Sequence, residues 1–230
     1  MTPRPLCILA IAAVLSACSA LTPPERTVHS ALATATPATA RNETALYLNV
    51  VDGLLAQKRF GAALAFLDDY SRKEKDLPPR YWLMRGNALV GLERYSEASG
   101  SYGRLESTSL AAEGWNGLGR TAASRKEWRI AADQFRKAVN ARPASVEFIN
   151  NLAYSSMKTG DIATSLSCLR QARDLDPTSD LVRNNLIIAL TLSGDITGAN
   201  ALAQTIADPQ LRRNVEATAQ AMTQSKRENG

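Results

Sequence analysis

Histidine and cysteine are scarce in this chain of 230 residues, which contains one histidine and three cysteines. His29 lies in a stretch of Pro, Thr, Ala and Ser, which supplies none of the fixed neighbours that acid–base catalysis or metal binding requires. The sequence also lacks a glycine-rich phosphate loop and any Cys/His cluster with metal-ligand spacing. It therefore predicts a protein that is not an enzyme, with no catalytic residue, metal, cofactor or small-molecule substrate.

Charge of one sign is not concentrated anywhere along the chain, although the formal net charge is +5. Such a balance can indicate a nucleic-acid partner when the basic residues cluster. Here the segments "SRKEKD" (71–76) and "RKEWR" (125–129) mix both signs, which is typical of solvated helix faces. We therefore expect no nucleic-acid partner.

A long hydrophobic run is also missing. The longest apolar stretch runs from Leu6 to Leu15, after Arg4, whereas a helix that crosses a bilayer needs about 20 apolar residues. A short apolar stretch behind a basic start, followed by small residues, is typical of a secretory signal peptide. Residues 1–17 are therefore expected to be removed on export, which is a further argument against nucleic acid.

The end of this stretch, Leu15-Ser16-Ala17-Cys18, resembles the bacterial lipobox. The resemblance implies that Cys18 becomes the first mature residue and carries acyl chains. Ser19 follows it where lipoproteins of the inner membrane typically have aspartate, so the resemblance implies an outer-membrane lipoprotein that faces the periplasm. Cleavage after Ala20 by an ordinary signal peptidase, or no cleavage, are the alternatives.

Four regions follow from the composition. Residues 1–17 are the signal peptide, and residues 18–43 are a flexible linker rich in Pro, Thr and Ala. Residues 44–222 are the folded body, and residues 223–230 are expected to be a disordered tail. Cys168 has no partner for an intramolecular disulfide and is expected to be a small core residue.

The body repeats with a period near 34 residues. One small residue recurs at gaps of 35, 33, 34 and 34, in the positions Ala63, Ala98, Ala131, Ser165 and Ala199. The best copy, with Trp115, Leu118, Gly119, Phe135 and Pro143, resembles the tetratricopeptide repeat. Small residues allow close helix approach, and aromatic residues, Trp128 included, are expected to fill the core between helices.

The resemblance implies an all-α, right-handed solenoid of about five helix-turn-helix repeats with a C-terminal capping helix. Ser145 is expected to cap one helix, and Asp176-Pro177 to end another. The expected repeats are 44–78, 79–111, 112–145, 146–179 and 180–207, and the cap is 208–222.

In such solenoids the first helices of successive repeats usually line a concave groove that accepts a partner. Asparagines recur there 34 residues apart, and an amide can pair with both groups of an extended backbone. Surface polarity without a ligand is the alternative reading. The candidate groove residues are Asn116, Arg120, Asn150, Tyr154, Met157, Asn184 and Ile188.

The lipobox, the linker, the repeats and the segments "VRNNLIIALTLSGD" (182–195) and "LRRNVEATAQAM" (211–222) together resemble TadD. That family comprises the tetratricopeptide lipoproteins of the tight-adherence (Flp) pilus system. The resemblance implies a pilotin-like assembly factor whose partners are proteins of the pilus or secretion apparatus, the outer-membrane secretin above all. A lipoprotein adaptor of type IV pili or of envelope biogenesis, and a capping accessory without a groove, are the alternatives.

Overall fold

The computed structural model describes residues 37–228, and their side chains between residues 44 and 224. This part of the chain consists of α-helices joined by short turns, without a strand. The helices are α1 (Pro37–Ala56), α2 (Phe60–Lys73), α3 (Pro79–Gly91), α4 (Tyr95–Gly103), α5 (Ala111–Ser124), α6 (Trp128–Ala141), α7 (Val146–Thr159), α8 (Ile162–Leu175), α9 (Asp180–Ser193), α10 (Ile196–Ala203) and α11 (Pro209–Glu228).

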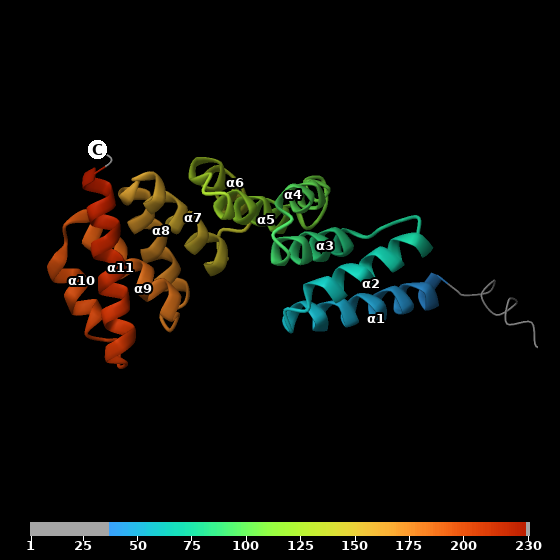
Figure 1. The fold of residues 1–230 in the computed structure, drawn as a ribbon, viewed down its shortest axis with the longest axis horizontal. Coiled ribbons are helices and arrows are strands. Elements are labelled where there is room, and N and C mark those ends of the chain that lie inside the picture. Colours follow the sequence, from blue (N-terminus) through green and yellow to red (C-terminus); the bar gives the residue numbers. More distant parts are fainter. Residues whose placement is uncertain (1–36, 229–230) are drawn as a thin grey trace, which may run out of the picture. The chain divides into compact units, whose positions relative to one another are not determined.

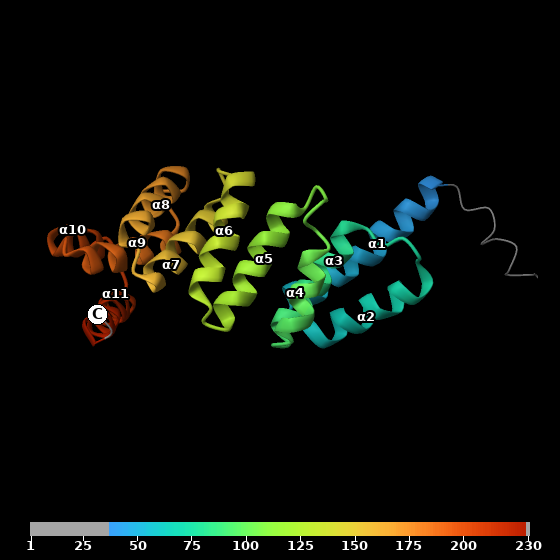
Figure 2. The same cartoon turned by 90° about the horizontal axis from the view of Figure 1, so that it is seen from above.

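Residues 44–228 belong to one compact unit, in which consecutive helices pack against one another as hairpins. The pairs α3/α4, α5/α6, α7/α8 and α9/α10 follow one another along the unit (Figure 1), and Figure 2 shows the same succession from above. The first helices of neighbouring pairs also touch, since α3 contacts α5, α5 contacts α7, and α7 contacts α9. The expected all-α tetratricopeptide-type solenoid is confirmed.

The turn inside each hairpin uses one residue with a left-handed backbone. These residues are Lys58 (φ 57°), Glu93 (φ 59°), Lys126 (φ 63°), Gly160 (φ 85°) and Gly194 (φ 89°). Their positions differ by 35, 33, 34 and 34 residues, the same gaps that the small residues show in the sequence. The backbone therefore keeps the register of the repeats through five hairpins, namely α1/α2 and the four pairs named above.

The recurring small residues lie in the interior, as expected. Ala63, Ala98, Ala131 and Ser165 are fully buried, and Ala199 is nearly so. Tyr102 and Phe135 are also buried, which confirms part of the prediction for the aromatic residues. Their rings occupy the space that glycines leave open on the neighbouring helices: Tyr102 lies against Gly86 and Gly117, and Phe135 lies against Gly119.

Helix ends follow the local sequence. The hydroxyl of Ser145 accepts a hydrogen bond from the backbone N–H of Phe148 at 3.4 Å, which confirms the predicted cap of α7. Ser179, Asp161 and Asp195 cap α9, α8 and α10 in the same way. Helix α8 ends at Leu175, directly before the Asp176-Pro177 dipeptide that predicts this end.

Both terminal helices are longer than the sequence suggested. Helix α1 begins at Pro37, inside the segment assigned to the linker, because proline is favourable in a first helical turn and the residues that follow it include several alanines. Helix α11 continues to Glu228, past the predicted end of the cap at residue 222. It packs against α9, and its Val215 and Ala219 join the core of the last repeat.

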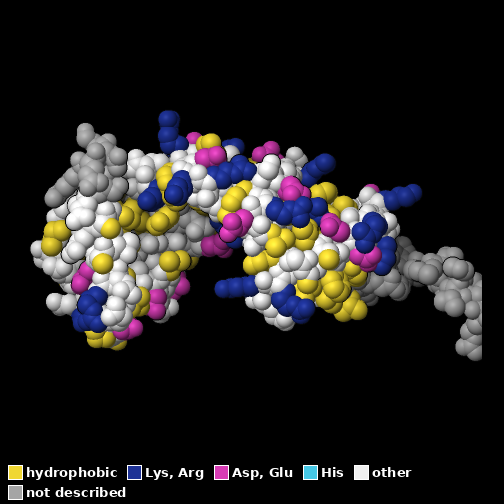
Figure 3. All heavy atoms as spheres, in the orientation of Figure 1, with side chains coloured by type: hydrophobic (Ala, Val, Ile, Leu, Met, Phe, Trp, Pro, Cys, Tyr) yellow, Lys and Arg dark blue, Asp and Glu magenta, His cyan; other side chains and the backbone are white. Residues whose placement is uncertain are grey.

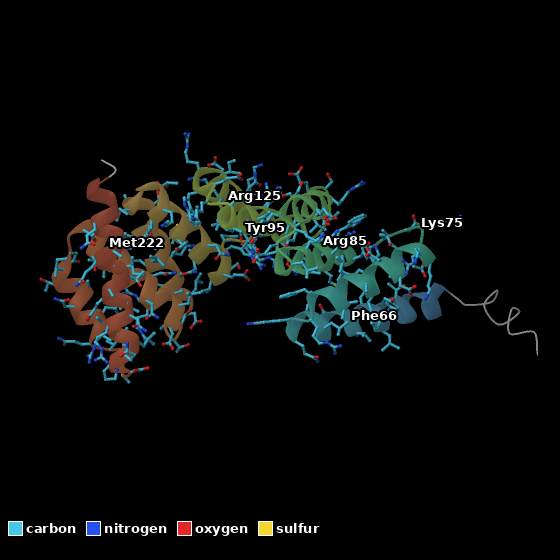
Figure 4. The ribbon with its side chains drawn as sticks, viewed as in Figure 1. Phe66, Lys75, Arg85, Tyr95, Arg125 and Met222 are labelled. Atoms are coloured by element: carbon cyan, nitrogen blue, oxygen red, sulfur yellow. The ribbon has the colours of Figure 1, made fainter. Side chains whose placement is uncertain are left out.

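The surface of the described residues mixes charges of both signs, as the space-filling view in Figure 3 shows. Hydrophobic side chains gather over the first hairpin, where Phe66 of α2 is exposed (Figures 3 and 4). Among the described helices, none combines the length and the apolar character that a membrane crossing requires.

Candidate partner-binding groove

A cavity of about 400 Å³ opens along the first helices of four successive repeats. It receives Val90 from α3, Arg120 from α5, Asn151 and Tyr154 from α7, and Leu181 and Asn185 from α9. Trp128 and Phe135 of α6 close it from the side. The cavity has the volume of an ordinary ligand pocket and an open mouth lined by both amide and apolar groups. We refer to it as the groove cavity.

The structure brings three of the seven candidate groove residues together at this cavity, namely Arg120, Asn150 and Tyr154. Tyr154 keeps 38% of its surface exposed, and its ring meets the edge of Trp128 with 5.9 Å between ring centroids. The amide of Asn150 is largely covered, since this residue is only 4% exposed. The other four candidates, Asn116, Met157, Asn184 and Ile188, lie outside the lining.

Asn116 and Asn150 hold neighbouring repeats together. The Nδ2 of Asn151 donates to Oδ1 of Asn116 at 2.9 Å, and the Nδ2 of Asn185 donates to Oδ1 of Asn150 at 2.8 Å. Asn116 also donates from Nδ2 to Oε1 of Glu147 at 2.9 Å. These bonds form an asparagine ladder that crosses from α5 to α7 and from α7 to α9. Buried amides that are bonded in this way are fixed in orientation.

Met157 and Ile188 are 4% and 6% exposed and belong to the core of the last repeats. Ile188 occupies the place on α9 that Tyr154 has on α7, but α9 is covered by α11 and shares its core with Val215 and Ala219 of that helix. Ile188 is therefore part of the core and does not line the groove cavity. Asn184 is half-buried, and its Oδ1 has no hydrogen-bond partner among the described residues.

The sequence reasoning missed Asn151, Asn185 and Leu181, and it assigned Trp128 to the core. Asn151 and Asn185 directly follow the predicted asparagines, and adjacent helical residues point in directions about 100° apart. The doublets Asn150-Asn151 and Asn184-Asn185 were the available signal, because two amides in adjacent positions reach two neighbouring surfaces. Trp128 is only half-buried and stands at the side of the cavity.

The charge in the groove cavity is positive. None of its lining residues is Asp or Glu, and Arg120 makes no salt bridge with the described residues. The ammonium of Lys158 lies 5.3 Å from the centre of the Trp128 ring, beside the cavity. Cation–aromatic contacts of this kind are weakly favourable and hold a lysine near a ring.

A buried tyrosine, Tyr102 of α4, packs between the helices of the second repeat. Burial raises the pKa of Tyr102 to about 12, so the phenol stays protonated at neutral pH. Its hydroxyl donates to Oδ1 of Asn87 at 2.8 Å. Cys168 is half-buried against the cores of two repeats, and burial raises the pKa of its thiol, which disfavours the reactive thiolate.

The candidate lipidation site, Cys18, lies outside the described residues, as does His29. Within the described part of the chain, no group of three or more His, Cys, Asp or Glu side chains is placed to hold a metal ion.

Comparison with known families supports the repeat assignment. Residues 83–146, which cover α4, α5, α6 and most of α3, match the family model described as tetratricopeptide repeat. Over these residues the chain is similar to the tetratricopeptide repeat, and the helical hairpins of the described residues have the matching architecture.

One curated relative is a TPR repeat-containing protein of Pseudomonas aeruginosa, PA4299, which is 29% identical over 164 residues. The match covers 70% of this chain and 64% of the relative, which is less than two thirds of the relative's length.

Solved structures share the fold. MamA of Desulfovibrio magneticus RS-1 superposes with a TM-score of 0.60 at 20% identity, over 75% of this chain and 94% of that one. YrrB, described as a TPR protein with an unusual peptide-binding site, superposes with a TM-score of 0.59 at 17% identity, over 74% of this chain and 90% of that one. At these identities the likeness shows the fold alone.

Proposed function

We propose that this protein is a non-enzymatic scaffold that grips an extended segment of another protein in the groove cavity. The observation that supports the proposal is the cavity itself, which four repeats share and which leaves Tyr154 and Leu181 exposed beside asparagine amides. Exposed apolar side chains next to fixed polar groups are typical of recognition surfaces. The peptide-binding site named for YrrB is consistent with this use of the fold.

We further propose that the scaffold is a lipoprotein of the outer membrane and acts as a TadD-like, pilotin-like factor for a pilus secretin. Support comes from the sequence: the lipobox-like Leu15–Cys18, Ser19 after the cysteine, and the resemblance of the last two repeats and the cap to TadD. Acyl chains on Cys18 would confine the groove to one membrane surface, and confinement raises the effective concentration of membrane-bound partners.

The test is a deletion of the gene, followed by detection of secretin multimers after heating in detergent. Loss of the multimers, restored by the wild-type chain, is the expected result. Restoration by a chain with Tyr154→Ala and Leu181→Ser should fail, because this variant keeps the fold and loses the apolar part of the groove. Normal multimers and normal piliation in the deletion strain would refute the pilotin role and favour an adaptor of another envelope system.

A further inference from the structure

Arg120 is the charged residue in the lining of the groove cavity, and it has no ion-pair partner among the described residues. Its side chain is exposed, and the residues that line the cavity include no carboxylate. Two carboxylates of the flanking helices have partners of their own: Glu113 pairs with Arg142 at 2.6 Å, and Glu147 accepts a hydrogen bond from Asn116. A guanidinium that lacks a partner beside an apolar recess is suited to bind a carboxylate on a ligand.

The apolar part of the cavity lies next to this charge. Tyr154 is the residue of α7 equivalent to Arg120 of α5, one repeat later. Its ring, the ring of Trp128 and the side chain of Leu181, which is 61% exposed, form a recess of the groove cavity. Burying an aliphatic or aromatic side chain there would remove this apolar surface from water, which is favourable.

The hydrogen bonds of the asparagine ladder fix whether Asn151 offers its side-chain oxygen or its side-chain nitrogen to a ligand. A carboxylate can only accept hydrogen bonds, so Glu147 obliges Asn116 to present its Nδ2. The Oδ1 of Asn116 then faces Asn151, which must donate from its own Nδ2. The Oδ1 of Asn151 is left to accept, in a residue that lines the cavity. An acceptor in this position can bind the backbone N–H of an extended chain.

We propose that the groove cavity recognises an extended peptide segment in which an Asp or Glu lies close to an aliphatic or aromatic residue. The carboxylate binds Arg120, the apolar side chain enters the Trp128–Tyr154–Leu181 recess, and a backbone N–H donates to Asn151. The inference rests on the proposed function, since it names the chemistry of the segment that the scaffold grips.

The experiment selects ligands without assuming a partner. The full-length chain, purified in mild detergent, is used to select from a phage-displayed library of random dodecapeptides. The enriched peptide is then synthesised with an amidated C-terminus, so that its only carboxylates are side chains. Its affinity is measured by calorimetry for the wild-type chain, for Arg120→Gln, and for the control Arg125→Gln. Arg125 lies at the turn after α5, outside the lining (Figure 4).

The expected motif contains an acidic residue near an apolar one. Arg120→Gln should lower the affinity for the peptide about tenfold, as expected for the loss of one charge-assisted hydrogen bond. Arg125→Gln should leave the affinity unchanged. Replacing the acidic residue of the peptide by its amide should have the same effect as Arg120→Gln. N-methylation of the neighbouring backbone amide should also weaken binding.

Three results would overturn the inference. A motif without acidic residues, or equal affinities for wild type and Arg120→Gln, would remove the acidic specificity while leaving a peptide groove in place. An enriched motif that binds equally well to the Tyr154→Ala, Leu181→Ser variant would place the ligand elsewhere on the protein. The absence of any enriched motif would remove the proposed groove function together with the inference.

Discussion

The ring of Tyr102 lies directly against the backbone of Gly117, where the second and third repeats meet. A methyl group added at Gly117 would come within 2.4 Å of Cε1 of Tyr102, and the tyrosine is fully buried. A methyl group added at Gly86 would come within 2.5 Å of the same ring atom. Two glycines in two repeats therefore shape the space for one tyrosine.

Replacing Gly117 by alanine should lower the free energy of unfolding by about 1–3 kcal/mol, because the overpacked ring must shift against its neighbours. The control is Gly100→Ala on α4, where an added methyl group meets nothing within 4 Å. That change should stabilise the protein by about 0.5–1 kcal/mol, since alanine favours a helix more than glycine does. Urea unfolding followed by circular dichroism measures both. Equal effects of the two variants would contradict the packing argument.

Replacing Asn150 by alanine should lower the free energy of unfolding by about 1–3 kcal/mol. The reason is that the buried Nδ2 of Asn185 loses its hydrogen-bond acceptor. In a double-mutant cycle, Asn150→Ala and Asn185→Ala should show a coupling of about 1 kcal/mol. The exposed Asn200→Ala serves as control and should be nearly neutral. Additive effects of Asn150 and Asn185 would mean that the ladder does not couple repeats.

Replacing Lys126 by glycine should raise stability by up to about 1 kcal/mol, because a side chain at φ 63° strains the backbone and glycine does not. Lys137→Gly, at an exposed position inside α6, should instead lower stability by about 1 kcal/mol. Thermal unfolding of both variants beside the wild type is the measurement. Destabilisation by Lys126→Gly would show that the lysine side chain contributes more than the strain costs.

The cap of α8 should make stability depend on pH. Hydrogen bonds from the side chain and backbone of Thr164 hold the pKa of Asp161 below its usual range. A carboxyl group with a lowered folded-state pKa stabilises the protein above its unfolded pKa, and this contribution is lost as the pH falls through the folded value. Asp161→Asn keeps a capping side chain without the ionisation.

The wild-type chain should therefore lose more stability between pH 5 and about pH 3 than the Asp161→Asn variant does. Urea midpoints at a series of pH values report the difference. Parallel curves for the two proteins would show that the ionisation of Asp161 does not contribute.

Replacing Cys18 by serine should move the protein from the membrane pellet to the soluble envelope fraction, because serine cannot carry the thioether-linked lipid. Cys168→Ser is the matched control, since this thiol is half-buried in the repeat body and should leave fractionation unchanged. Retention of the Cys18→Ser protein in the pellet would refute lipid anchoring at this position.

The repeat architecture could be derived from the sequence because each repeat carries its own local signals. Small residues at Ala63, Ala98, Ala131, Ser165 and Ala199 predict close helix contacts, and the structure buries all five. Ser145 and Asp176-Pro177 predict a helix start and a helix end, and both are found. These signals act within one hairpin or between neighbouring hairpins, so their spacing along the chain is sufficient to place them.

The groove cavity lies on the helices named from the sequence, but only three of the seven candidate residues line it. Arg120, Asn150 and Tyr154 line the cavity, whereas Asn116 is bonded between repeats and Met157 and Ile188 are in the core. The rotation of each helix about its own axis decides such differences, and that rotation depends on which neighbours cover it. Ile188 belongs to a core that also contains Val215 and Ala219 of α11, and the repeat pattern does not encode the packing of α11 on α9.

By itself, then, the sequence determined the helical hairpins, their number and their order, because the periodic small and aromatic residues specify local packing. Only the tertiary structure decided which amides face one another across repeats and which remain available to a ligand. The physical reason is that a hydrogen bond such as that from Asn151 to Asn116 joins residues 35 positions apart, and its direction is set by a third residue, Glu147.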